Sequence, residues 1–221
     1  MNTGDSINAA LGLWNFGHGV EEIFDEHVRK SVPGYDMSHH IVSLLSDPFI
    51  RINSTILDIG CSTGTFSRLI HKRHNEKKVF VIGIDNQENM IQKATDLDES
   101  KQITFQYSDI INDDIPHGVD MTACFYTLQF VPPSVRQEVV NKIYNSLNWG
   151  GAFFLFEKVR APDARFQDYI NHAFINFKLQ SFDAEEIVGK TNSLIGVLEP
   201  FSTQGNIDLL QRAGFVDICT V

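Results

Sequence analysis

Hydrophobic residues follow two alternating patterns from Thr55 onward. Short, nearly continuous apolar runs predict buried β-strands over residues 55–59, 78–85, 103–109, 119–128 and 152–158. Between these runs, apolar residues three or four positions apart predict α-helices over 66–73, 89–98 and 133–147. Strands that alternate with helices across short turns predict an α/β fold with a doubly wound, mostly parallel sheet.

Helical patterns also flank this alternating region. Upstream, one helix is predicted over 20–30, followed by a turn over 31–36 and a second helix with the apolar stripe Ile41, Val42, Leu44 and Leu45. Downstream, helices are predicted over 163–180, 183–198 and 207–213, before a last strand over 216–221. The first of these carries the apolar stripe Phe166, Tyr169, Ile170, Ala173, Phe174 and Phe177.

The length of 221 residues fits a single domain, 1–221. Within it we expect N-terminal helices over 1–54 and a ligand-binding core over 55–159. A helical insertion over 160–203 should form a lid above the strand ends, and 204–221 should hold the last helix and strand.

Charge and cysteine content narrow the class of protein. With 18 Lys plus Arg against 28 Asp plus Glu, the net charge is −10, which argues against direct nucleic-acid binding. The three cysteines have no metal-ligand spacing and indicate a reduced, cytoplasmic protein. We expect no signal peptide, membrane span or metal, and we interpret His39 and His40 as a surface or lid pair.

The first strand runs into a glycine turn, Asp58 to Gly64, with the sequence DIGCSTG. Gly60 and Gly64 let the backbone turn sharply and approach a ligand. No Lys follows Gly64, so the turn is not a phosphate-binding P-loop, and the glycine spacing fits a dinucleotide fingerprint poorly. The remaining candidate is the [DE]xGxxxG turn that holds the methionine part of S-adenosylmethionine, in which Cys61 contributes its backbone N–H and not a nucleophilic thiol.

Two later strand ends support this interpretation. Asp85 ends the second predicted strand and is placed to accept hydrogen bonds from the two hydroxyls of a ribose. Asp109 ends the third and can accept from an adenine amino group while Ile110 packs on the ring. Either aspartate alone could be a turn residue, but three motifs at consecutive strand ends predict an S-adenosylmethionine site.

The chain resembles the class I S-adenosylmethionine-dependent methyltransferases, and more closely the carboxy-S-adenosylmethionine synthase family. The segments that carry the resemblance are WNF (14–16), VEEIFDEHV (20–28), SVPGY (31–35), DIGCS (58–62), IDNQENMI (84–91), YTLQF (126–130), KIYNSLNWGGA (142–152), EK (157–158) and RAGF (212–215). The resemblance implies a Rossmann-like methyltransferase fold. That family converts S-adenosylmethionine and prephenate into a carboxylated sulfonium used in modification of the tRNA wobble uridine.

The resemblance also implies which residues contact the cofactor. The family's contacts fall on Tyr35, Gly60, Cys61, Ser62, Asp85, Asn86, Asp109 and Ile110, and the predicted site adds Asp58, Gly64 and Phe125.

Two family positions differ in this chain. Phe125 stands where the family has Asn, and Thr191, within Lys190-Thr191-Asn192, stands where it has Arg. A carboxylated sulfonium carries an extra negative charge that is costly to bury without a fixed cation. Lys190 could replace that cation only if it points inward, since its neighbour on a helix faces about 100° away.

These differences favour a methyltransferase that transfers a methyl group to a small-molecule acceptor and leaves S-adenosylhomocysteine. The alternatives are a carboxy-S-adenosylmethionine synthase and a non-catalytic methyltransferase-like binding protein.

Four residues are candidates for the acceptor side: Tyr126, Glu157, Phe174 and His172. For His172 a structural role is favoured over that of a base, and Glu157 is equally an ion-pair partner in the neighbourhood of Lys158. The sequence ends six residues after Phe215, whereas the related fold continues into a seventh, antiparallel strand. Either that strand is absent or a partner chain covers its neighbour, and the resemblance suggests a homodimer.

Overall fold

The chain folds around one parallel β-sheet in a computed structural model that describes residues 1–5, 7–17 and 19–221. The strands are β1 (Thr55–Ile59), β2 (Phe80–Asp85), β3 (Ile103–Tyr107), β4 (Val119–Phe125) and β5 (Leu147–Phe156). They lie in the order β3-β2-β1-β4-β5, and each neighbouring pair is parallel. The prediction of an α/β fold with a mostly parallel sheet is confirmed.

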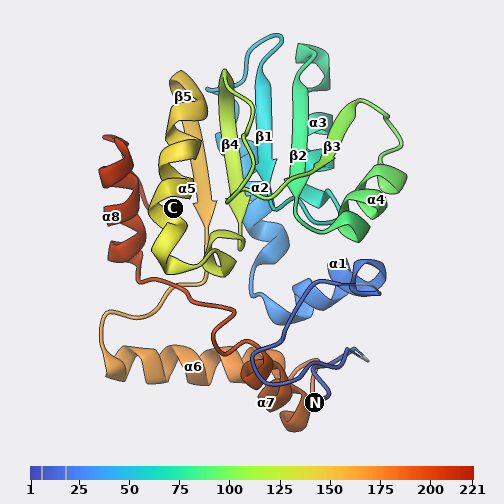
Figure 1. Ribbon diagram of the computed structural model, residues 1–221, viewed down its shortest axis with the longest axis vertical. Coiled ribbons are helices and arrows are strands. Elements are labelled where there is room, and N and C mark those ends of the chain that lie inside the picture. The colour runs from blue at the N-terminus through green and yellow to red at the C-terminus, as the bar shows by residue number, and fades with distance from the viewer. Residues whose placement is uncertain (6, 18) are drawn as a thin grey trace.

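Helices cover both faces of this sheet (Figure 1). They are α1 (Val20–Ser31), α2 (Tyr35–Leu45), α3 (Thr65–His74), α4 (Glu88–Leu97), α5 (Pro133–Ser146), α6 (Ala164–Lys178), α7 (Ala184–Ser193) and α8 (Thr203–Ala213). Val140 of α5 and Leu209 of α8 share one hydrophobic cluster, and Val42 of α2 and Ile70 of α3 share another. The core is therefore split into two layers, as expected for a doubly wound sheet.

The carboxyl ends of the strands point toward α1, α6 and α7, which lie beyond the sheet in Figure 1. In open α/β sheets, ligands bind at this edge. In the part of the chain that the structure describes, no helix is long and apolar enough to cross a membrane.

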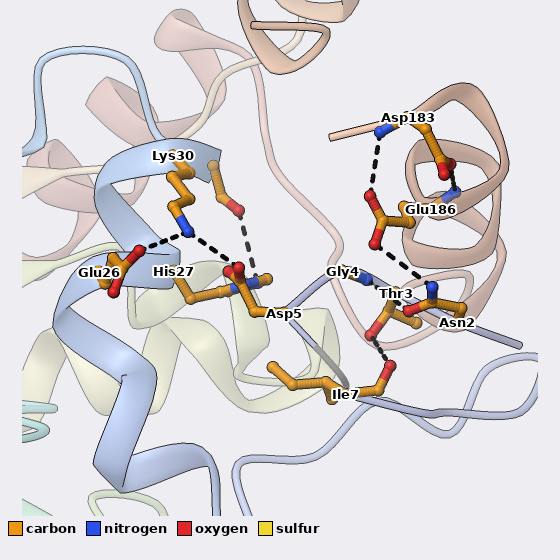
Figure 2. Close-up of polar contacts among 11 residues, drawn as sticks. Asn2, Thr3, Gly4, Asp5, Ile7, Glu26, His27, Lys30, Asp183 and Glu186 are labelled. Atoms are coloured by element: carbon orange, nitrogen blue, oxygen red, sulfur yellow. Dashed lines mark hydrogen bonds and ion pairs between the residues drawn. The ribbon is translucent and has the colours of Figure 1, made fainter. Parts of the chain in front are cut away.

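The N-terminal segment, residues 1–5 and 7–17, is hydrogen-bonded to both α1 and α7 (Figure 2). Asp5 accepts from Lys30 of α1 at 2.9 Å and pairs with His27 at 2.8 Å. On the other side, the Asn2 amide donates to Glu186 of α7 at 3.3 Å. The segment then runs along the end of α7, where the backbone N–H of Trp14 donates to the carbonyl of Ser193. It thus carries Trp14 to the edge of the lid.

Two predictions about strands are wrong. Residues 216–221 form no strand and lie beyond α8, which ends at Gly214 with a left-handed φ of 115°. The fifth strand begins at Leu147 and not at 152, because Gly150 and Gly151 lie inside β5, where its register with β4 shifts.

Two apolar stripes are also exposed in part. Leu44 and Leu45 of α2 reach solvent, because the buried face of that helix begins earlier, at Tyr35 and Ser38. On α6, Phe166 and Tyr169 are 45% and 64% exposed, so this helix does not pack into the main core. A period of 3.6 residues shows that a helix has an apolar face, but not what covers it.

Candidate functional site

A cavity of about 1000 Å³ lies at the carboxyl ends of the strands. It is lined by the ends of β1, β2 and β3 on one side and by residues of the N-terminal segment, α6 and α7 on the other. Its volume is at the upper end for ligand pockets, which leaves room for a nucleoside cofactor together with a second, smaller molecule.

The glycine turn after β1 is fixed to β2 by backbone hydrogen bonds. The N–H groups of Gly60 and Cys61 both donate to the carbonyl of Ile84, at 2.8 and 3.0 Å. Gly60 has a φ of 70°, and a Cβ atom there would collide with Thr127. Glycine is therefore required at this position on grounds of both conformation and space.

Helix α1 fixes the far side of the turn. Asp25 accepts hydrogen bonds from the hydroxyls of Thr63 and Thr65, at 2.7 and 3.1 Å. Gly64 precedes α3 with a φ of 77° and does not line the cavity. Cys61 lines the cavity, but its backbone N–H already donates to Ile84, so the prediction that this N–H serves the ligand is wrong. Its thiol is buried, which raises the pKa well above the ordinary value.

Asp85 connects the glycine turn to the end of β2. One carboxylate oxygen accepts from the backbone N–H of Ser62 at 2.9 Å, and the other accepts from that of Gln87 at 2.9 Å. Each oxygen keeps a second lone pair, which the two hydroxyls of a ribose could use. Burial raises the pKa of Asp85 to about 6.

Asp58 also lines the cavity, but its role in the structure is local. It is 2% exposed and accepts from the Ser67 hydroxyl at 2.6 Å. Burial raises its pKa to about 7. Asp58 therefore connects β1 to α3 beneath the turn.

The end of β3 supplies the other predicted contacts. Asp109 accepts from the N–H of Ile111 at 3.0 Å and from the amide of Asn112 at 2.7 Å, so it does stabilise its own turn. It lines the cavity beside the buried Ile110, and Asn86 lines it after β2. The three predicted motifs thus lie side by side along β1, β2 and β3.

Aromatic rings form the wall on the β4 side. Tyr35 and Phe125 line the cavity and are each 8% exposed. Tyr126 has the left-handed φ of 55° that bulky residues rarely adopt, and its ring lies 6.1 Å from that of Tyr35. His39 is in contact with both Tyr35 and Phe125, so the prediction of a surface or lid pair is wrong for His39, whereas His40 is exposed.

Glu157 lies in the cavity wall after β5. Its two oxygens accept from the N–H groups of Leu128 and Gln129, at 2.9 and 2.8 Å, and burial raises its pKa to about 8. It does not pair with Lys158, whose ammonium group lies 4.6 Å from the ring of Phe174. Glu157 thus holds the backbone that follows β4.

His172 is the predicted acceptor-side residue that lies elsewhere. It is on an exposed part of α6 outside the cavity, 3.0 Å from the Asn176 amide. His172 was predicted to lie near the pocket because it is adjacent to the apolar stripe of α6. In the structure its side chain is on the exposed face of the helix.

Two lysines on the lid were not predicted as site residues. Lys178 and Lys190 are 6% and 9% exposed and line the cavity. Each ammonium group lies over an aromatic ring, Lys178 over Phe174 at 4.6 Å and Lys190 over Trp14. The sequence alone gave one indication, that Lys190 is adjacent to Thr191. It did not show whether the Lys190 side chain points toward the cavity.

No metal site competes with this interpretation among the residues described. There, no group of three or more His, Cys, Asp or Glu side chains is placed to hold an ion.

Comparison with known proteins identifies the fold and the relatives. A family model described as "Methyltransferase domain" matches residues 56–151. The carboxy-S-adenosyl-L-methionine synthase of Staphylococcus epidermidis is 35% identical over 202 residues, which cover 89% of this chain and 86% of that protein.

Solved structures agree on the fold. The YcgJ protein of Bacillus subtilis is similar with a TM-score of 0.61, at 16% identity over 82% of this chain and 69% of that one. Phosphoethanolamine N-methyltransferase 2 of Haemonchus contortus, solved with S-adenosyl-L-methionine, gives a TM-score of 0.59 at 14% identity, over 93% of this chain and 45% of that one. The sheet and its helices are those of S-adenosylmethionine-dependent methyltransferases.

Proposed function

Because the chain belongs to the carboxy-S-adenosyl-L-methionine synthase family, we propose that it carboxylates S-adenosylmethionine with prephenate as the donor. The chain is an S-adenosylmethionine-dependent transferase. When bound, this cofactor supplies a carbon activated by the adjacent sulfonium. In the proposed reaction prephenate loses one carboxyl group as CO2 and its ring hydroxyl group as hydroxide, and becomes phenylpyruvate. The hydroxide takes one proton from the sulfonium methyl group and leaves as water, and the methyl carbon forms the new bond to CO2.

The observation that carries the proposal is that the buried amino groups of Lys178 and Lys190 have no anionic partner in the part of the chain that the structure describes. In the described ranges, neither has a carboxylate within ion-pair distance. Burial and the charge of Lys178 lower the pKa of Lys190 to about 6, and burial and the charge of Lys158 lower that of Lys178 to about 8. Removing a charge from water is costly without a paired ion, so Lys190 is mostly neutral at pH 7 until an anionic ligand raises its pKa and restores the ammonium charge.

An anionic ligand would provide the missing partner. Prephenate carries two carboxylates, and the proposed product carries one more than S-adenosylmethionine. An ammonium group beside an aromatic face can rotate its three donors toward such a ligand. Lys190 lines the cavity next to Thr191, which supports the proposal that it takes the place of the family's Arg.

The other residues of the site would bind and orient. Asp85 and the turn at Gly60 would hold the ribose and methionine parts, which aligns the sulfonium with the space next to β4. The aromatic wall of Tyr35, Phe125 and Tyr126 would exclude water from that space.

Methyl transfer to a small-molecule acceptor is the second candidate. It is favoured by Phe125 and Thr191, which stand where the family has Asn and Arg.

The test is incubation of the protein with S-adenosylmethionine and prephenate, followed by mass spectrometry. A carboxylated sulfonium is expected, and Lys190→Met should raise the KM for prephenate roughly tenfold or more while leaving the affinity for S-adenosylhomocysteine within twofold. Lys72→Met, an exposed lysine of α3, is the matched control and should change neither value. Absence of the product in the wild-type reaction would overturn the proposal, and methylation of an added acceptor would support the second candidate.

The cytoplasmic location, the homodimer and the absence of nucleic-acid binding stay predictions. The first is supported by the cysteine pattern and the last by the net charge of −10.

A further inference from the structure

His39 is a buried polar residue in an aromatic environment. It lies on α2 and is 3% exposed. Its ring centroid is 4.4 Å from that of Tyr35, 4.4 Å from that of Phe125 and 5.6 Å from that of Phe66. The ring also lines the cavity.

Neither ring nitrogen of His39 has a hydrogen-bond partner among residues 1–5, 7–17 and 19–221. Nδ1 is fully enclosed, so the imidazole meets the cavity with its other side. Burial lowers the pKa of His39 to about 4, which keeps the ring neutral at pH 7. A buried N–H group without an acceptor is rarer than a buried lone pair without a donor. We therefore assign the lone pair to the enclosed Nδ1 and the proton to Nε2.

An apolar side chain would suit the ligand-free protein better. A buried polar atom without a partner destabilises the folded state, whereas an apolar group of similar shape avoids that cost. Residues that conflict with their surroundings in this way concentrate at functional sites.

The position of His39 indicates which ligand it meets. The predicted adenine, ribose and methionine contacts lie on β3, β2 and β1, so the reactive end of the cofactor points toward β4, the other neighbour of β1. Phe125 ends β4 and Phe66 lies in the first turn of α3, which follows β1. His39, packed against both, therefore lies at the boundary between the methionine end and the space for the second substrate.

We infer that His39 is a specificity-determining residue whose Nε2–H donates a hydrogen bond to a neutral oxygen of the carboxyl donor. This inference rests on the proposed function. The hydroxyl and keto oxygens of prephenate are of the right kind, because its carboxylates are matched by the lysines of the lid. A neutral donor in an apolar wall selects an uncharged acceptor atom.

The test compares three variants: His39→Leu, His39→Gln and the control His40→Leu, which changes the exposed neighbour on the same helix. Prephenate is titrated calorimetrically into each protein saturated with S-adenosylhomocysteine, and ligand-free melting temperatures are measured. For His39→Leu we expect a prephenate affinity that is roughly 2- to 10-fold weaker, an unchanged affinity for S-adenosylhomocysteine, and an equal or higher melting temperature. His39→Gln, which keeps a donor, should recover part of the affinity, and His40→Leu should match the wild type.

Four results would overturn the inference. One is a prephenate affinity that is unchanged in His39→Leu. Another is a loss of affinity for both ligands together with a lower melting temperature, which indicates a structural role. If the wild-type complex forms carboxylated product and His39→Leu has the same KM for prephenate, the inference fails alone; if the wild-type complex does not bind prephenate, the proposed function fails with it.

Discussion

The cofactor side and the lid side of the cavity differ in whether their buried titratable groups have hydrogen-bond partners in the protein. On the cofactor side, Asp58 and Asp85 each accept hydrogen bonds from the protein. On the lid side, Lys178 and Lys190 contact aromatic rings and no carboxylate in the described part of the chain. The carboxyl groups of the first side have hydrogen-bond donors within the fold, whereas the amino groups of the second have no acceptor among the described residues and are available to a ligand.

This difference follows from the elements that build each side. The cofactor side consists of strand ends and tight turns, where backbone N–H groups are fixed in place and available as donors. The lid side consists of α6, α7 and the N-terminal segment, whose cationic groups in the cavity wall are the side chains of Lys178 and Lys190. We therefore expect substitutions on the cofactor side to lower stability together with binding, and substitutions on the lid side to separate the two.

The largest effect is expected for Asp85→Ala. The change removes the acceptor for the N–H groups of Ser62 and Gln87 as well as the contacts to the ribose. The affinity for S-adenosylhomocysteine should fall roughly 30-fold or more, since the lost hydrogen bonds sum to at least about 2 kcal/mol. Calorimetric titration measures the affinity, and a melting temperature that falls in parallel would confirm the structural share.

Asp109→Ala is the matched comparison. Its carboxylate is partly exposed and bonded within its own turn, so the affinity should fall less than for Asp85→Ala. Equal losses would contradict this ranking of the two aspartates.

The same contrast explains what the sequence could predict. The ends of β1 and β2 were predicted correctly because continuous apolar runs stop at Gly or Asp, and both signals are local. The cofactor motifs could be placed side by side from the sequence alone, because the carboxyl ends of parallel strands lie at the same edge of the sheet.

The lid could not be predicted in this way. The direction of Lys190 depends on contacts between α7 and Trp14, which lie far apart in the sequence. His39 was interpreted as exposed because its neighbours gave no sign that α2 begins as early as Tyr35. These are tertiary effects that helical periodicity does not contain.

The second prediction concerns the stability of Lys190→Met as a function of pH. The pKa of Lys190 is about 6 in the folded protein and about 10.5 in the unfolded chain, so folding releases a proton between these values. The unfolded state binds more protons there, and wild-type stability from this group rises with pH. Methionine does not titrate, so the variant's advantage in melting temperature should be largest near pH 6 and disappear toward pH 10.

Melts of both proteins at pH 6, 8 and 9.5 measure this difference. Lys178 and Asp5, which act on Lys190 electrostatically, are present in both proteins, so their own titration largely cancels. A difference that is the same at every pH would contradict an unpaired Lys190.

The third prediction is a modest loss of stability for Glu157→Gln. The amide of Gln has one acceptor oxygen, so either Leu128 or Gln129 loses its acceptor. Unfolding in urea should show a loss of about 1–2 kcal/mol, and kcat should fall less than tenfold. A fall in kcat by a larger factor at unchanged stability would instead make Glu157 a proton acceptor in the reaction.

The smallest effect is expected for Thr191→Ala, next to Lys190. The Thr191 hydroxyl donates to the carbonyl of Ile187 in its own helix at 2.8 Å, so it has a partner without any ligand. The KM for prephenate should change less than twofold, and the free energy of unfolding by less than about 0.5 kcal/mol. If Thr191→Ala instead weakened prephenate binding as much as Lys190→Met, several groups of α7 would donate to the anion together. The lid side would then bind its ligand as the cofactor side does, through several fixed donors.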